Sequence, residues 1–158
     1  MANPADEKVI SPFTAFNFAI EIDVPGVAAQ VCNAAFSECD GLEMTMDIKT
    51  IREGGNNGKQ IRLTGPINYG QLTLKRGMTA NFDLWDWFNR MLTEPALRAD
   101  ATVVLKAAES ATERARFLLT RCVPIKLKAP ALNAKDGLIA IEELQLSYES
   151  LTLQPPEG

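Results

Sequence analysis

The chain has 158 residues, 46% of them hydrophobic, which is enough for one domain with a sizeable core. Its net charge is −4 and its Lys and Arg residues are scattered, which argues against a nucleic-acid-binding protein. It contains no histidine, which excludes Ser–His and Cys–His catalysis and His-ligated metal sites.

The cysteines and the N-terminus indicate the compartment. Cys32, Cys39 and Cys122 have no CxxC spacing, so we expect small buried thiols rather than a disulfide framework or a zinc site. Residues 1–8 are too polar for a signal peptide, and no apolar run approaches the roughly 20 residues that span a bilayer. We therefore expect synthesis in the cytoplasm, with no direct membrane insertion by the monomer.

Alternation of apolar and polar residues predicts the first strands. Phe16 to Ile22 alternates and is stopped by Pro25 and Gly26, so it predicts a half-buried strand. A more apolar run, Val31 to Cys39, predicts a second strand that ends at the turn signal Asp40-Gly41.

A long hairpin is predicted next. Leu42 to Ile48 alternates, the segment Gly54 to Gly58 breaks the pattern, and Gln60 to Leu63 resumes it. Glycine and asparagine tolerate positive φ, so we expect a hairpin with an extended tip. Gly65-Pro66 then predicts a turn, and Leu72 and Leu74 predict a short strand.

One helix is predicted, from about Asn81 to Leu92, with Thr79 or Asn81 as its cap. Such a short helix is marginal alone, so it has to dock on a sheet. Trp87 lies off the apolar stripe and is expected to pack against the sheet or a neighbouring subunit, with base stacking as an alternative that no basic groove supports. The residues predicted to pack the helix against the core form one apolar stripe: Phe82, Trp85, Phe88 and Met91.

The second half returns to strands. Ala101 to Ala107 and Arg114 to Val123 alternate, and Pro124 and Pro130 bracket a short strand from Ile125 to Lys128. Lys135-Asp-Gly137 is a hairpin signal.

The last long run, Leu138 to Leu153, changes its apolar phase near Glu142-Glu143, which predicts a bulge or bend there, and the phase changes back by Leu151. The order of strands, one helix and strands predicts a mainly β fold, an antiparallel β-sandwich or barrel with the helix packed on it. We expect a single domain over residues 1–158, flexible at 1–10 and 154–158.

The search for catalytic groups leads to no site and implies no cofactor. Glu142 and Glu143 are adjacent, but neighbours on a strand face opposite sides, so they do not form a catalytic dyad. The segment Gly54 to Gly58 lacks the GK[ST] of a P-loop. We therefore predict no enzymatic activity, no metal site and no cofactor.

The strand pattern predicts self-assembly instead. Long strands expose edges that recruit other chains, and identical subunits that join edge to edge close a sheet around a channel with wet polar faces. The loop at 52–60 is too long and charged for a tight hairpin and suits a contact with another subunit. From the residues alone, a solvated mobile loop remains the alternative.

Seven segments, in this order, resemble the tail-tube (inner tube) protein family of contractile phage tails and contractile injection systems. The resemblance extends from Phe13 to Leu153. The segments that carry it are Phe36–Glu43, Ile51–Gly58, Gly65-Pro66, Leu72–Gly77, Leu84–Phe88, Leu132–Gly137 and Ile141–Glu149.

The resemblance implies a structural subunit. Six copies would form a ring, rings would stack into a rigid hollow tube, and contraction of a surrounding sheath would drive the tube through a target envelope. The implied partners are the protein itself, the sheath protein, the baseplate or tube-initiator and terminator proteins, and a protein effector or DNA as cargo in the lumen. The two longest hairpins, around residues 42–76 and 114–153, would supply the channel wall.

By the same resemblance, one loop would contact the adjacent ring. Its residues are Arg52, Glu53, Gly54, Gly55, Asn56, Asn57, Gly58 and Lys59.

Two alternatives remain. The hexameric ring protein of type VI secretion shares the fold, and a monomeric β-sandwich binding module is the more distant possibility. The second would need an exposed site that does not depend on assembly, and the sequence contains none that we recognise.

Overall fold

A computed structural model describes residues 13–15, 17–26, 36–52, 54–55, 58–135 and 137–155. The part described is mainly β, with one helix, and the strands pair antiparallel throughout. The elements in chain order are β1 (Phe18–Asp23), β2 (Glu38–Asp40), β3 (Met44–Arg52), β4 (Gln60–Tyr69), β5 (Gln71–Gly77), α1 (Asp83–Thr93), β6 (Ala99–Lys106), β7 (Glu113–Lys128), β8 (Ile141–Ser147) and β9 (Ser150–Gln154).

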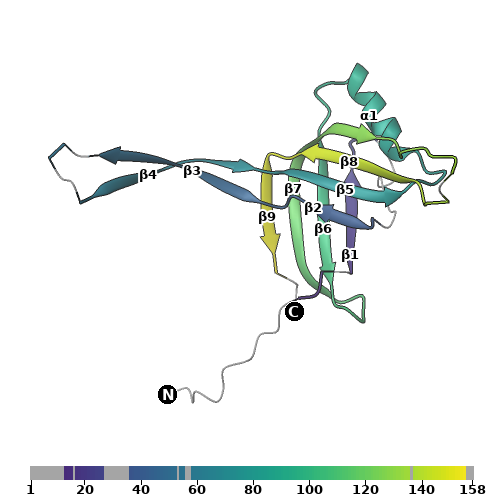
Figure 1. Cartoon of the computed structure of the whole chain (residues 1–158), viewed down its shortest axis with the longest axis horizontal. Helices are drawn as coiled ribbons and strands as arrows, with labels where there is room; N and C mark the ends of the chain where they lie inside the picture. Colours follow the sequence, from purple (N-terminus) through teal and green to yellow (C-terminus); the bar gives the residue numbers. More distant parts are fainter. Residues whose placement is uncertain are drawn as a thin grey trace, which may run out of the picture.

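Two regions stand out in Figure 1: a body, and an arm that projects from it. The arm is the hairpin β3–β4, whose strands pair only with each other among the described residues. The body contains the other strands in the order β1-β6-β7-β8-β5-β2, with β9 beside β7 and α1 at one end. The predicted antiparallel sandwich or barrel with one packed helix is confirmed.

The strands of the body form two layers, and strand β7 belongs to both of them. Its first part pairs with β6 and β9, and its last part, Val123 to Lys128, pairs with β8. The change of partner lies at Arg121, whose φ is +51°, and a register shift follows between Pro124 and Lys126. The prediction of a separate strand over Ile125–Lys128 is therefore wrong, because Pro124 lies inside one continuous bent strand.

The core lies between the two layers and is built from the alternating positions of the strands. Apolar residues from β1, β5, β6, β7 and β8 meet there, and burial of this surface is the main driving force for folding. The buried hydrophobic residues of this cluster include Ile20, Ile22, Leu72, Leu74, Val103, Leu119, Leu144, Leu146 and Tyr148.

Helix α1 begins two residues later than predicted and turns a different face to the core. The N-cap residue is Phe82, whose side chain makes no capping hydrogen bond. The side chain of Asn81, one residue earlier, accepts a hydrogen bond from the Asp83 N–H at 3.1 Å. Leu84 and Trp87 are the buried residues of the helix.

The prediction that Phe82, Trp85, Phe88 and Met91 pack the helix into the core is wrong. Phe82 is 53% exposed and the other three are only half-buried. The helix is apolar over a wide arc, so periodicity fits more than one phase, and the predicted stripe lies about a quarter turn, roughly 90°, away from the buried one. Trp87, placed off the stripe by the sequence pattern, is 2% exposed and belongs to the core.

The expected bulge near Glu142-Glu143 is also absent, because β5 and β8 pair without a register shift from Ile141 to Ser147. Glu142 keeps the same inward phase as Leu144 and Leu146 and is itself buried. A charged residue at an inward position, such as Glu142, imitates a change of phase in the alternation of apolar and polar residues. The later phase change is the break between β8 and β9 at Tyr148-Glu149.

Several other predictions have clear outcomes. The strand expected over Phe16 to Ile22 is confirmed as β1, and those expected over 101–107 and 114–123 as β6 and the first part of β7. Of the strand expected over Val31 to Cys39, residues 31–35 lie outside the described part. Residues 1–10 do as well, whereas Gln154, expected to be flexible, pairs with Arg116 in β9.

Candidate assembly surfaces

The arm is fixed to the body at its root. The hydroxyl of Tyr148 donates a hydrogen bond to the Gly41 carbonyl at 2.7 Å and accepts one from the Glu43 N–H at 3.2 Å. The ring of Tyr148 also contacts that of Tyr69, with the ring centres 5.7 Å apart. Gly41 has φ +107°, and a Cβ there would lie 1.9 Å from the carbonyl oxygen of Gln71. The hairpin therefore leaves the core in a defined direction.

A bulge interrupts the arm where a turn was predicted. Gly65 and Pro66 lie inside β4, and the register shifts opposite them, between Met46 and Ile48. A Cβ at Gly65 would lie 2.5 Å from the Asp47 carbonyl oxygen, so the close approach of the strands requires glycine. The prediction of a turn at Gly65-Pro66 is therefore wrong: a glycine and a proline within a strand commonly mark a bulge instead.

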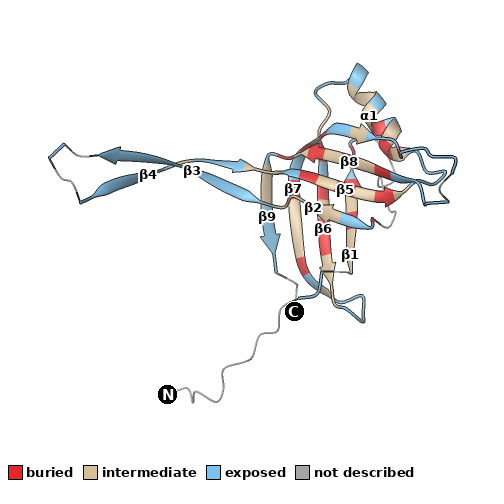
Figure 2. Ribbon diagram, viewed as in Figure 1, coloured by how far each residue is buried: buried red, intermediate tan, exposed pale blue. Residues whose placement is uncertain are grey.

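The arm is exposed over its whole length, and many of its exposed side chains are apolar (Figure 2). Near the root, Met44, Met46 and Ile48 alternate onto one face of the ribbon. Near the tip, Ile51 and its partner Ile61 lie on the other face. The two strands cross once in Figure 1, so the ribbon turns over between root and tip. Each half of the ribbon therefore has one face rich in exposed apolar side chains, which we call the apolar side of the arm.

The described residues of the predicted ring-stacking loop lie at the far end of the arm (Figure 1). Arg52, Gly54, Gly55, Gly58 and Lys59 are all exposed. Glu53, Asn56 and Asn57 lie outside the described residues, so their side chains are not placed. A Cβ on Gly54 or Gly55 would meet nothing within 4 Å. The fold thus carries the described residues of this tip loop, which spans residues 52–59, away from the body.

A buried ion pair that sequence reasoning missed lies beneath the helix. Arg76 on β5 pairs with Glu142 on β8, and their side chains are 2% and 1% exposed. The Trp85 indole donates to Glu142 at 3.0 Å, and Arg76 donates to the Asn81 carbonyl at 3.2 Å. These bonds connect the start of α1 to two strands. The sequence does contain a signal for this ion pair, because Arg76 and Glu142 occupy positions where the alternation of their strands calls for a buried apolar residue.

Among the described residues, no second acidic side chain is buried beside this pair. Glu143, its neighbour in sequence, faces the other side of β8, as predicted. No group of at least three His, Cys, Asp or Glu residues able to hold a metal ion occurs within the described ranges. Burial raises the pKa of the Cys122 thiol from 9.0 to about 12 and that of Cys39 to about 11. Cys122 is therefore an inert buried thiol; Cys32 lies outside the described part.

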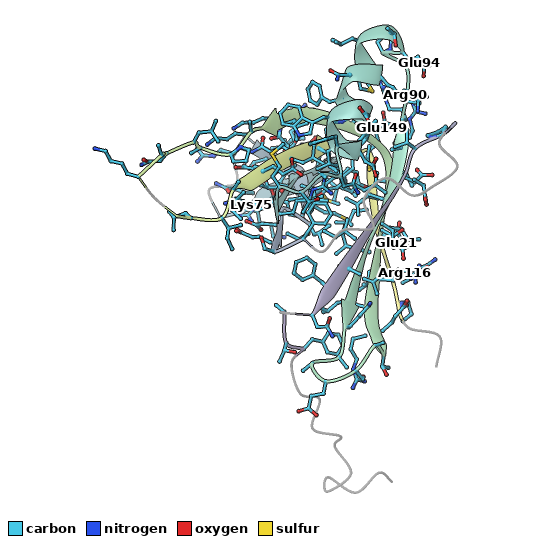
Figure 3. The ribbon with its side chains drawn as sticks, turned by 90° about the vertical axis from the view of Figure 1, so that its right-hand side faces the viewer. Glu21, Lys75, Arg90, Glu94, Arg116 and Glu149 are labelled. Carbon is cyan, nitrogen blue, oxygen red and sulfur yellow. The ribbon has the colours of Figure 1, made fainter. Side chains whose placement is uncertain are left out.

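The outer face of the layer β2-β5-β8-β7 is polar. Lys75 on β5 pairs with Glu38 on β2 at 3.6 Å, and Figure 3 shows Lys75 on the side of the body away from the helix. A hollow of about 530 Å³ lies between this face and the 129–141 loop, where Lys75, Lys128 and Glu143 meet Leu132 and Leu138.

Comparison with known proteins assigns this chain to a family. Residues 14–152 match the family model of the T4-like virus tail tube protein gp19. The chain belongs to this tail tube family. It is a tube subunit, a structural component of a phage tail-like particle. No curated protein matches the chain significantly in sequence.

Solved structures share the fold of this tail tube protein. A chain of the anti-feeding prophage baseplate, six-fold symmetrised, is 23% identical with a TM-score of 0.84, covering 94% of this chain and 99% of that one. A chain of the sheath–tube complex of the PVC extracellular contractile injection system is 19% identical with a TM-score of 0.79, covering 98% and 99%. Hcp1 from Flavobacterium johnsoniae is less similar, at 14% identity and a TM-score of 0.50, covering 87% and 95%.

In the described part of this tail tube protein, no helix is long and apolar enough to span a membrane.

Proposed function

We propose that six copies of this chain form a ring, and that the rings stack into the hollow inner tube of a contractile injection system or contractile phage tail. A sheath surrounds the tube, a baseplate initiates it, and contraction drives it through a target envelope with protein or DNA cargo in the lumen. The subunit catalyses nothing. Family membership supports this proposal, as do the six-fold baseplate, sheath–tube and tube-terminating cap assemblies that contain chains of this fold.

The observation that carries the proposal is the arm. A two-stranded ribbon alone is at best marginally stable in water, yet this one exposes Met44, Met46, Ile48 and Ile67. Contiguous exposed apolar surface of this kind marks a protein interface. A neighbouring copy in the ring or in the next ring covers the apolar side, and the tip loop, residues 52–59, contacts the adjacent ring.

Deleting Gly54 to Gly58 tests the tip loop. The arm root and the core stay intact, so the monomer folds with an unchanged melting temperature, and rings form but do not stack. Gly54→Ser is the matched control, because it keeps the loop length and its side chain enters open space. Long tubes from the deletion variant, seen by negative-stain electron microscopy, would show that the loop does not stack rings.

The ring protein of type VI secretion is the second candidate. Its support is the shared fold of Hcp1 proteins, at TM-scores of 0.50 and 0.51, well below those of the injection-system chains. Co-expression with the sheath protein encoded nearest to this gene separates the two. Sheathed tubes support the contractile-tail assignment, and bare rings with no sheath binding support the secretion protein.

A further inference from the structure

Charges alternate across the outer face of the layer β2-β5-β8-β7. The strand registers place Glu38 opposite Lys75, Lys75 opposite Glu143, and Glu143 opposite Lys128. Residues that lie directly opposite each other on paired strands share a face and are close enough to interact. The ion pair between Lys75 Nζ and Glu38 Oε2, 3.6 Å apart, is an example on this face. One row therefore reads acid, base, acid, base from the β2 edge to the β7 edge.

The next row on this face is neutral in the middle and charged at its ends. Asp40 lies opposite Thr73, Thr73 opposite Gln145, and Gln145 opposite Lys126. The β2 edge thus carries Glu38 and Asp40, and the β7 edge carries Lys126 and Lys128. Glu38 pairs with Lys75, and the other three form no ion pair with another described residue. The two edges have opposite charge.

Both edges are open to another strand. Within the described residues, β2 pairs only with β5, and the Val123–Lys128 part of β7 pairs only with β8. Open edges present unpaired backbone groups that recruit another chain. Just inside these edges, Cys39 and Leu127 are half-buried and contact the core cluster, so a neighbouring copy would extend the core as well as the sheet.

The geometry of the two edges matches. The layer contains four strands that alternate in direction, so a copy rotated about a ring axis brings its β2 antiparallel to β7. The two lysines are two residues apart, as are the two acids, and they run in opposite directions. One antiparallel register therefore satisfies Lys128–Glu38 and Lys126–Asp40 together.

We propose that these charged edges recognise each other between neighbouring copies of this chain, with Lys126 and Lys128 of one copy against Asp40 and Glu38 of the next. The inference rests on the proposed ring and specifies its lateral contact. It makes the contact head-to-tail, because a two-fold contact would place acid against acid or lysine against lysine, which is unfavourable. The alternating row then continues around the ring.

Two charge-reversed variants test this recognition. K126E/K128E has two acidic edges, and E38K/D40K has two basic edges. Each variant alone should fold with circular dichroism like that of the wild type and require at least a tenfold higher concentration to form rings, measured by light scattering. An equimolar mixture should form rings again, and native mass spectrometry should find equal numbers of the two variants in them.

A matched control carries the same change in charge elsewhere. R114E/K135E reverses two exposed charges outside β2 and outside the Val123–Lys128 part of β7, and should form rings at the wild-type concentration. Rings from either edge variant alone at the wild-type concentration would overturn the recognition, as would a well-folded mixture that forms none. If the wild type itself forms no ring, the proposed function fails instead, so the two failures are distinguishable.

Discussion

The body and the arm of this protein use apolar residues in opposite ways. In the body, Leu72, Leu74 and Leu144 are fully buried, and even the charged residues Arg76 and Glu142 are removed from water. In the arm, Ile48 is 58% exposed and Met44 60%. The body buries its apolar residues through its own contacts, whereas the apolar side of the arm is exposed in the single chain. Substitutions should therefore separate into those that unfold the monomer and those that affect assembly.

The largest loss of stability should come from breaking the buried ion pair. Arg76→Met leaves the Glu142 carboxylate buried opposite an apolar side chain, with the Trp85 N–H still donating to it. Loss of one partner of such a pair lowers the free energy of unfolding by about 3–5 kcal/mol. Urea unfolding of R76M and of R76M/E142L measures this. The double variant should recover much of the loss, and a double variant as unstable as R76M would show that the pair's charges are not the cause.

A somewhat smaller loss should distinguish the two faces of the helix. Trp87→Ala removes a buried side chain and should lower the free energy of unfolding by about 3 kcal/mol or more. Phe82→Ala, at a 53% exposed position, should stay within about 1 kcal/mol of the wild type. Thermal unfolding of both variants checks the helix phase, and equal losses would contradict it.

Alkaline pH should weaken the body through its thiols. Burial raises the pKa of Cys122 to about 12, against 9.0 for the exposed thiol of the unfolded chain. Below pH 9 the Cys122 thiol is protonated in both the folded and the unfolded chain, so its contribution to stability is complete. As the pH rises from 9 towards 12, the thiol ionises only in the unfolded chain, so the free energy of unfolding falls and this contribution is lost. Cys122→Ala should flatten the decline in melting temperature above pH 9. An unchanged decline would show that other groups cause it.

The smallest effect on folding should come from the arm. Ile48→Asn should change the free energy of unfolding by about 0.5 kcal/mol or less, because the side chain is exposed in the monomer. Assembly should nevertheless be lost, because the substitution places a polar group on the apolar side. Sedimentation measures this loss. Thr45→Asn, on the opposite face of β3, is the matched control and should assemble normally. Assembly of I48N like the wild type would contradict a covered apolar side.

The same comparison explains what the sequence predicts well. Alternation identified β1, β5 and β6, because strands covered on one face have period two. It identified β3 as well, although both faces of β3 are exposed in the single chain, and Gly54-Gly55 identified the arm tip through its turn chemistry. The tip loop is a local feature, so it was predicted without any knowledge of packing.

The failures all involve tertiary contacts. Glu142 is buried in an ion pair with Arg76, which is distant in sequence, so the sequence pattern around Glu142 imitates a change of phase. Trp87 and Trp85 are both apolar, and the sheet beneath the helix decides which one is buried. Gly65-Pro66 has the composition of a turn, and the opposing strand at Asp47 makes it a bulge. The charge-matched edges depend on the registers of four strands, which periodicity alone does not determine.

The most direct test of the central claim is the assembly of the purified full-length protein. Negative-stain electron microscopy with light scattering should reveal rings or tubes with a central hole, at about six times the chain mass of 17.3 kDa for a single ring. A protein that stays monomeric at high concentration, even with its baseplate initiator added as a template, would contradict the tube-subunit account.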